Sequence, residues 1–393
     1  MRLLARLATA ALLTVPPIAA GTAAADTPEP TPVPLHTAAN AVPGKYIVTL
    51  EKGQDAAKVA TKLGLKPTFV YSKAMTGFAV PLTPLQLQIV RVSLGVKSVE
   101  EDAKVQSVPQ PAKAPGVRAP SSSWGLDRID QKLLPLDGDF STEGNGAGVN
   151  AYILDTGIDY AHDEFGGRAT FGFDAIGDGR LGADCQGHGT HVAGTVGGKT
   201  YGVARKVNLV SVRVLGCDGY GEYSGIIAGL DWVAKNAKQP AVLNGSLGGD
   251  KSIALNDAAN ALSDAGVLPV VAAGNSSKDA CLVSPASATR VFTVGATNRY
   301  DEETSFSNYG SCLSAYAPGE DILSAKLGGG SVALNGTSMA APHVAGVVAL
   351  YKAAHPTALP GEIAEFLNAE STKDVVQNIS KGSPNELLFT AGL

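Results

Sequence analysis

A serine stands between a glycine and a run of small residues in the stretch Gly336-Thr337-Ser338-Met339-Ala340-Ala341-Pro342-His343. The apolar residues 344–350 follow directly, so the pattern predicts a tight turn that opens into a buried helix. Pro342 fits a first turn, where backbone N–H groups have no intrahelical partner. Ser338 is then expected at the positive end of the helix, which stabilises negative charge. Since a serine at this place is commonly only a helix cap, its function depends on the rest of the chain.

The composition is that of a packed α/β protein. The 393 residues are enough for one large domain and a smaller one. Glycine is abundant, with 46 residues, and aromatic residues make up only 6%. The net charge of −5 is small and gives no indication of a nucleic-acid partner.

The first 25 residues are typical of a secretion signal. Two arginines precede a short apolar core at 7–15, and three alanines ending at Ala25 offer a cleavage site. A membrane anchor is the alternative, but two prolines end the apolar run short of the ~20 residues that span a bilayer. No later segment is suited to span one. The sequence therefore predicts a secreted, extracellular protein without a membrane anchor.

Composition shifts divide the rest of the chain. Residues 26–43 are rich in Pro, Thr and Ala and are expected to form a linker without packed structure. Residues 44–108 follow the order β-α-β-β-α-β, with strands at 45–50, 68–71, 77–80 and 96–101 and helices at 55–63 and 83–94, which is a ferredoxin-like arrangement. Residues 109–123 form a second linker that is expected to contain a processing site. Residues 124–393 form the large domain.

Short apolar strands alternate with helices in the large domain. Strands are expected at 149–154, 207–214, 241–243, 267–272 and 291–294, and helices at 190–196, 224–235, 252–265 and 338–354. This alternation predicts a doubly wound, mostly parallel sheet. Such sheets place their functional sites outside the carboxyl ends of the strands.

Four cysteines indicate two disulfides in a secreted chain. They allow three pairings, of which the neighbour pairing Cys185–Cys217 and Cys281–Cys312 is the simplest. A zinc site built from the four cysteines is the alternative, but the close CxxC pairs of such sites are absent.

Three polar residues stand at places suited to catalysis. Asp155 ends a predicted strand, His188 lies between two glycines, and Asn275 follows another strand. Histidine is the usual general base near neutral pH, and an asparagine amide can donate to an oxyanion. The spacing of His188 and His191 allows a metal pair, but no acidic third ligand stands at helical spacing, so His191 is interpreted as a packed helix residue.

The order Asp155, His188, Ser338 is one of the orders known for a serine-peptidase triad. The segments Asp155-Thr-Gly, His188-Gly-Thr-His, Ser246-Leu-Gly-Gly, Ala273-Gly-Asn275 and the octet at 336–343 resemble those of the subtilisin-like serine peptidases. Residues 124–130, 201–204 and 305–310 and both cysteine pairs resemble the proteinase K branch, particularly its aqualysin-like secreted members. The segment 45–102 resembles the inhibitory propeptide of this family.

The resemblance implies a catalytic triad of Asp155, His188 and Ser338, with Asn275 and the Ser338 N–H as oxyanion donors. It also implies that the substrate pairs with two edges of the enzyme as an added strand and that small residues line the P1 pocket, which favours apolar or aromatic P1 side chains. The edges are Gly219, Tyr220, Gly221, Ser246, Leu247 and Gly248, and the pocket residues are Ala272, Ala273 and Gly274.

The resemblance further implies a structural calcium loop and no catalytic cofactor. Its oxygen ligands would come from Asp127, Asp130, Gln131, Asp137 and Asp139, a set that suits Ca²⁺; a solvated acidic loop is the alternative. The expected protein is a monomeric endopeptidase that acts on polypeptides and is autoprocessed from a proenzyme whose propeptide is chaperone and inhibitor. A peptide-binding pseudo-enzyme and a metal-dependent hydrolase remain alternatives.

Overall fold

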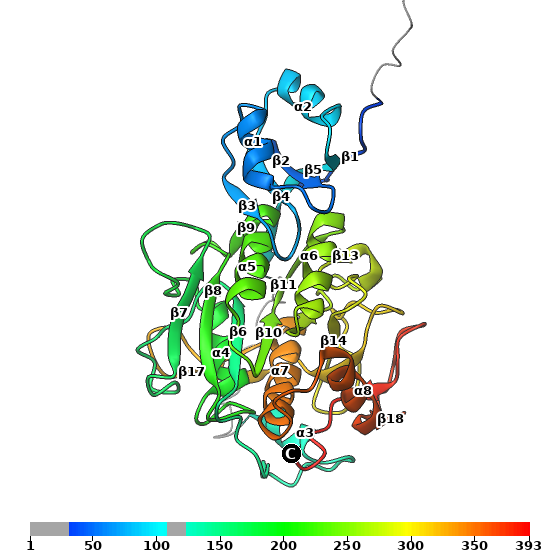
Figure 1. Ribbon diagram of the computed structural model, residues 1–393. Helices are drawn as coiled ribbons and strands as arrows, with labels where there is room; N and C mark the ends of the chain where they lie inside the picture. Colours follow the sequence, from blue (N-terminus) through cyan, green and yellow to red (C-terminus); the bar gives the residue numbers. More distant parts are fainter. Residues whose placement is uncertain (1–30, 108–122) are drawn as a thin grey trace, which may run out of the picture. The chain divides into compact units, whose positions relative to one another are not determined.

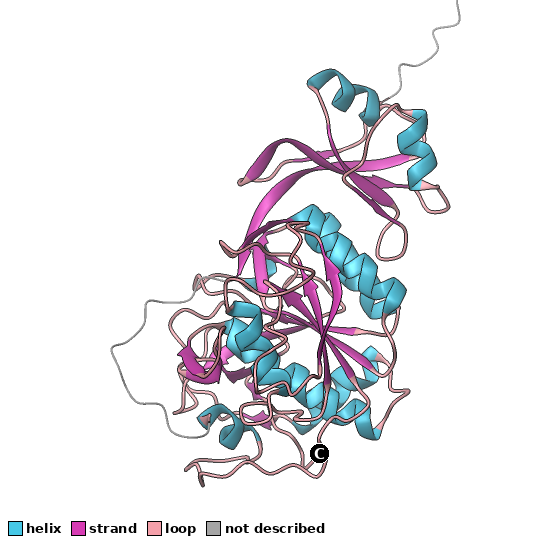
Figure 2. Ribbon diagram, turned by 90° about the vertical axis from the view of Figure 1, so that its left-hand side faces the viewer, coloured by secondary structure: helices cyan, strands magenta, loops and turns pink. Residues whose placement is uncertain are grey.

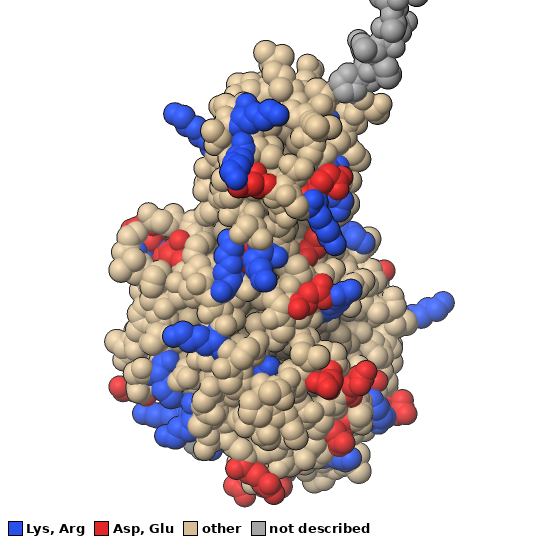
Figure 3. All heavy atoms as spheres, in the orientation of Figure 1, with Lys and Arg blue, Asp and Glu red and all other residues tan. Residues whose placement is uncertain are grey.

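The computed structural model describes residues 31–107 and 123–393. The predicted secretion signal at 1–25 and most of the second linker lie outside these ranges. The chain from Pro32 to Leu393 forms one compact unit. In Figure 3, basic and acidic side chains lie interspersed over the face shown, without a large field of one sign.

Residues 33–107 contain the predicted β-α-β-β-α-β order (Figure 1). The elements are β2 (Ala41–Leu50), α1 (Ala56–Lys62), β3 (Phe69–Tyr71), β4 (Gly77–Pro81), α2 (Pro84–Arg91) and β5 (Val96–Ser107). Both helices have the expected starts: Asp55 accepts from the N–H of Lys58, and Thr83 forms a capping box with Gln86 ahead of Pro84. The strand order β5-β2-β4-β3 is antiparallel throughout.

The segment predicted as a linker at 26–43 differs from that expectation. A short strand β1 (Leu35–His36) pairs in parallel with β5, and β2 already begins at Ala41. The side chain of Glu101 also accepts a hydrogen bond from the N–H of Ala38. These contacts extend the small sheet, because its edge at β5 offers backbone groups that an extended chain can pair with.

The large sheet is mostly parallel, as predicted. Its order is β18-β19-β15-β14-β12-β10-β6-β8-β7, and β18 alone runs antiparallel to its neighbour. The strands are β6 (Asn150–Asp155), β7 (Ala169–Asp174), β8 (Asn208–Arg213), β10 (Ala241–Gly245), β12 (Leu268–Ala272), β14 (Phe292–Thr297), β15 (Ala315–Pro318), β18 (Thr372–Lys373) and β19 (Glu386–Leu387). From β6 the chain continues to β7 at the edge of the sheet and returns to β8, which lies next to β6; β10 then pairs with the other side of β6. The carboxyl ends of β6 and β10 therefore flank the topological switch point.

Helices cover both faces of this sheet, as Figure 2 shows. The side chains of α4 (His188–Gly197) and α7 (Thr337–Ala354) belong to one buried cluster, and those of α5 (Tyr223–Asn236) and α6 (Ile253–Asp264) belong to another. Helix α7 is buried nearly all round, which explains its alanines and glycine: small residues let it lie close to the sheet. The remaining elements are α3 (Trp124–Ile129), β9 (Tyr220–Glu222), β11 (Leu247–Asp250), η1 (Ala280–Leu282), β13 (Val283–Ser284), β16 (Ile322–Ala325), β17 (Ser331–Leu334) and α8 (Pro360–Glu370).

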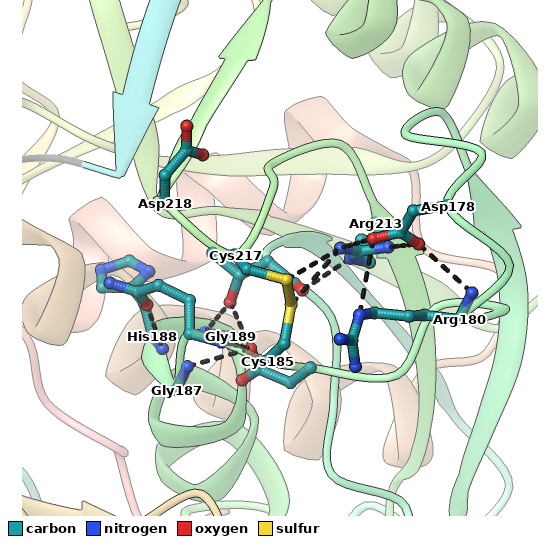
Figure 4. The surroundings of a disulfide bond; sticks show 12 residues. Asp178, Arg180, Cys185, Gly187, His188, Gly189, Arg213, Cys217 and Asp218 are labelled. Carbon is teal, nitrogen blue, oxygen red and sulfur yellow. Dashed lines mark hydrogen bonds and ion pairs between the residues drawn. A yellow bond between two sulfur atoms is a disulfide. The ribbon is translucent and has the colours of Figure 1, made fainter.

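Two disulfides have the predicted neighbour pairing, Cys185–Cys217 and Cys281–Cys312. The first joins the loop before α4 to the segment after β8 (Figure 4).

Candidate active site

Asp155 and His188 meet at the switch point of the sheet. Asp155 is the last residue of β6 and His188 is the first residue of α4, and both are buried. Nδ1 of His188 lies 2.8 Å from Oδ1 of Asp155. Because the carboxylate can only accept, Nδ1 carries the proton and Nε2 is left with a lone pair. The preceding Gly187 has φ 108°, a left-handed conformation that glycine adopts without strain.

The electrostatics of the pair increase the affinity of the imidazole for a second proton. Burial lowers the pKa of His188, but the charge of Asp155, its hydrogen bond to the ring and the charge of Asp184 raise it, and the net result is a raised pKa. A base of this kind takes a proton from a nucleophile and holds it as an imidazolium next to Asp155.

Ser338 lies in the first turn of α7, as predicted. Its hydroxyl donates to the carbonyl of Ser246 at 3.2 Å, and in the described part of the chain Nε2 of His188 has no hydrogen-bond partner. Catalytic hydrogen bonds are often not formed before substrate binds, so the absence of a Ser338–His188 hydrogen bond among the described residues does not argue against a serine–histidine pair.

Pro342 lies beyond the first turn of α7 and has a different consequence from the one expected. It has no N–H to donate to the carbonyl of Ser338 one turn earlier. The hydroxyl of Ser246 donates to that carbonyl instead, at 2.9 Å. Because Pro342 leaves this carbonyl free, the hydroxyl of Ser246 can link the start of α7 to the end of β10.

The side chain of Asn275 is held in one orientation. Its Oδ1 accepts from the N–H and the hydroxyl of Thr337, at 2.9 and 2.8 Å. The amide nitrogen therefore lies on the opposite side, close to Gly336, where an added Cβ would come within 2.9 Å of it. Asn308 fixes the same loop, since it donates to the carbonyl of Ala273 and accepts from the N–H of Ser276.

A segment of the chain itself lies between the two predicted substrate edges. The end of β5 pairs antiparallel with β9 through Gln106 and Tyr220, and with β11 through Gln106 and Gly248. The N–H of Ser107 donates to the carbonyl of Gly219 at 2.9 Å. Both edges therefore accept an extended chain as an added strand.

A cavity of about 360 Å³ opens between these edges and Asn275. Gly248, Gly274 and Val283 line it. Of the three residues predicted for the P1 pocket, Gly274 lines this cavity, whereas Ala272, the last residue of β12, and Ala273, directly after it, are fully buried in the core. Asp250, which was not predicted, also lines the cavity and lies 3.7 Å from the amine of Lys278.

His191 is packed as expected. Its Nε2 lies 3.0 Å from the carbonyls of Ile322 and Val332, so this nitrogen donates and is not available to a metal. In residues 31–107 and 123–393 there is no group of three or more His, Cys, Asp or Glu placed to hold a metal ion.

The predicted calcium ligands surround the loop after α3. Both carboxylate oxygens of Asp127 accept backbone N–H groups, from Asp137 and Gly138, and Gln131 also accepts from Asp137. Asp130 accepts from the N–H of Ser141. Asp139 donates its own N–H to Oδ1 of Asp137. Burial and, less strongly, the charge of Asp137 raise the pKa of Asp127 and of Asp130.

Comparison with known proteins places the chain among peptidases. Residues 146–392 match the subtilase family. An extracellular serine proteinase of Thermus sp. (strain Rt41A) is 45% identical over 380 residues, which cover 90% of this chain and 91% of the relative. A cuticle-degrading protease of Metarhizium anisopliae is 39% identical over 373 residues, which cover 92% and 93%. The crystal structure of a cold-adapted subtilisin-like serine proteinase matches with a TM-score of 0.68 and 48% identity, over 69% of this chain and 99% of that one.

The doubly wound sheet, the buried Asp–His pair and the serine at a helix start define a serine peptidase. The chain belongs to the subtilase family. Within the described part of the chain, no helix is long and apolar enough to cross a membrane.

Proposed function

We propose that this chain is a secreted, monomeric serine endopeptidase in which Ser338 is the nucleophile, His188 the general base and Asp155 the group that orients it. The observation that carries the proposal is the 2.8 Å contact of His188 with Asp155, at the sheet end where α7 begins. Asn275 and the N–H of Ser338 are the proposed oxyanion donors.

In the proposed mechanism Ser338 Oγ attacks the scissile carbonyl while its proton moves to Nε2 of His188. The carbonyl oxygen becomes an oxyanion, which receives hydrogen bonds from Asn275 and from the start of α7. His188 then gives the proton to the leaving amine, and an acyl-enzyme remains. Water, deprotonated by His188, releases the acid and restores Ser338.

Labelling with a fluorophosphonate tests this assignment. A peptidase with an activated serine forms a covalent adduct, and mass spectrometry of tryptic peptides is expected to place it on Ser338. A folded mature domain that neither reacts nor cleaves casein would instead support a protein that only binds peptides. Activity that disappears with a zinc chelator would support metal-dependent hydrolysis.

Replacing Asn275 with alanine is expected to reduce kcat by about 10²–10³-fold, on a scale set by subtilisin, itself a subtilase. KM is expected to change little, because the oxyanion forms only in the transition state. Steady-state kinetics on a chromogenic peptide measure both constants. A raised KM with an unchanged kcat would show that Asn275 binds the ground state instead.

For the P1 residue we propose a preference for apolar or aromatic side chains. Gly248, Gly274 and Val283 offer an uncharged surface, and Lys278 lies close to the charge of Asp250. We expect kcat/KM for a peptide with Phe at P1 to exceed that for Arg by at least about tenfold, since a buried guanidinium without a partner is costly. Equal rates, or faster cleavage after Arg, would show that Asp250 acts as an anionic pocket residue.

Residues 44–108 are proposed to be a propeptide that aids folding and inhibits the enzyme. Three buried carboxylates support this. Glu100 accepts from the N–H groups of Ile253 and Ala254 at the start of α6, and Asp102 accepts from the N–H of Ser224 in α5. In return, Asp231 of α5 accepts from three N–H groups at 72–74. The contacts of Glu100 and Asp102 satisfy the N-termini of α6 and α5, while β5 occupies the predicted substrate edges.

Calcium is proposed to stabilise the loop after α3. Among the described residues these side chains are not gathered as a ready ligand set. The carboxylates of Asp127, Asp130 and Asp137 nevertheless repel one another, and an ion that drew them together with Gln131 and Asp139 would relieve this repulsion. We expect excess EGTA to lower the melting temperature by several degrees, because loss of the ion would remove about 1–2 kcal/mol from the free energy of unfolding. Activity at room temperature is expected to persist. An unchanged melting temperature would exclude a stabilising ion.

A further inference from the structure

Asp184 is a buried carboxylate beside the proposed triad. It lies just before the disulfide cysteine Cys185, in the loop that leads to His188. Its Oδ1 accepts from the hydroxyl of Thr156 and from the N–H groups of Gln186 and Gly187, each at 2.9 Å. Its Oδ2 accepts from the N–H of Thr190 at 3.0 Å and from its hydroxyl at 2.6 Å. Both oxygens of the Asp184 side chain are therefore occupied as hydrogen-bond acceptors.

Thr156 connects this carboxylate to both members of the acid–base pair. Its N–H donates to Oδ1 of Asp155 at 2.7 Å, the same oxygen that contacts His188. Its hydroxyl donates to Asp184 and accepts from the N–H of Gly189 at 2.9 Å. Asp184 therefore fixes the end of β6 and the start of α4 relative to each other.

The charges around His188 are unevenly compensated. Asp155 faces it from β6, Asp184 from the preceding loop and His191 from α4, and Lys326 of the β16–β17 hairpin lines the same cavity as His188. Arg213 of β8 lies on the far side of the Cys185–Cys217 disulfide, paired with Asp178 (Figure 4). In the described ranges Arg213 pairs also with Asp174, whereas Asp184 has no cationic partner.

We propose that Asp184 is a positioning residue for His188: it fixes the backbone on which the imidazole is mounted and places a second uncompensated negative charge beside the ring. The proposal rests on His188 being the general base. Burial opposes protonation of His188, and the charge of Asp184 helps Asp155 to overcome it. Asp184 touches neither substrate nor the reacting atoms, so it acts only through His188.

Two substitutions separate geometry from charge. Asp184→Asn keeps the size and removes the charge, while Asp184→Glu keeps the charge and displaces the carboxylate. We expect kcat to fall by about 10–100-fold in both, because small displacements of a catalytic group are costly. The acid limb of the pH profile of kcat/KM reports the pKa of the general base in the free enzyme. We expect this limb to move to lower pH in Asp184→Asn and to keep its wild-type position in Asp184→Glu.

Asp163→Asn is the matched control, since it removes an exposed aspartate from the loop after β6. Because the charge of Asp163 is screened by water and ions, kcat and the position of the acid limb are expected to remain those of the wild type. An acid limb that does not move in Asp184→Asn, or moves equally in Asp184→Glu, would overturn the proposal.

If Asp184→Asn does not fold, Thr156→Val removes the hydrogen-bonded link while the charge of Asp184 remains. In this variant kcat is expected to fall without a shift of the acid limb, and a wild-type kcat would overturn the proposal. A wild-type chain that neither cleaves peptide nor reacts with fluorophosphonate would refute the proposed function itself.

Discussion

Replacement of Ser338 by alanine is expected to leave the full-length chain uncleaved. The side chain is fully buried and small, so alanine fits the start of α7 without disturbing its packing. It removes the only atom proposed to attack the carbonyl, and we expect kcat to fall by about 10⁶-fold, a scale again set by subtilisin. Self-processing would then stop, and a gel of the secreted protein would show a single band in place of a peptidase and its propeptide.

Ser331→Ala, which changes an exposed serine of β17, is the control and is expected to mature like the wild type. Adding active wild-type enzyme to the Ser338→Ala protein is expected to cleave it within the second linker at 109–123, for which a processing site was predicted and most of which lies outside the described residues. N-terminal sequencing would locate the bond. Normal maturation of Ser338→Ala in a host without other peptidases would show that processing is not performed by the chain itself.

The strands that could be predicted from the sequence are the central ones. β6, β10 and β12 are buried on both faces and therefore appear as short apolar runs. The edge strand β7 was not predicted, because it is partly exposed and carries Phe171 on the surface. The short strands β15, β18 and β19 were also missed, since two to four residues contain no usable period.

In the site, too, features that depend on the local sequence could be predicted, and features that depend on tertiary contacts could not. Asp155, His188 and Ser338 stand in distinctive local surroundings, but only the strand order brings the first two together. The residues that orient the site side chains were not predicted, although Thr337 belongs to the octet at 336–343 and Asp184 lies four residues before His188. Their functions arise from hydrogen bonds to segments distant in sequence: Thr337 fixes Asn275, and Asp184 binds Thr156. No spacing rule contains that information.

Acid is expected to unfold this protein through two buried histidines that take no part in the proposed chemistry. Burial lowers the pKa of His191 to about 3 and that of His343 to about 4. His343 donates from Nδ1 to the carbonyl of Met339 and has Gly125 against its other nitrogen, where an added Cβ would come within 2.7 Å. Among the described residues, Nδ1 of His191 and Nε2 of His343 have no hydrogen-bond partner, so a second proton on either ring would be buried without an acceptor.

The unfolded chain binds these protons near the ordinary histidine pKa of about 6.5, whereas the folded protein does not. The contribution of the two histidines to the free energy of unfolding therefore has its full value above about pH 6.5, and it decreases as the pH falls toward 4. Each histidine contributes on the order of 3–5 kcal/mol to this decrease, against a typical total of about 5–15 kcal/mol. Urea unfolding of the inactive Ser338→Ala protein, followed by circular dichroism between pH 7 and 4, measures it without autolysis.

His343→Leu is expected to remove about half of the pH dependence, because leucine fills a similar volume and cannot be protonated. His355→Gln, at the exposed end of α7, is the control and is expected to leave the slope unchanged. The comparison between these two variants decides the cause: a slope that persists unchanged in His343→Leu would assign acid unfolding to groups other than this histidine.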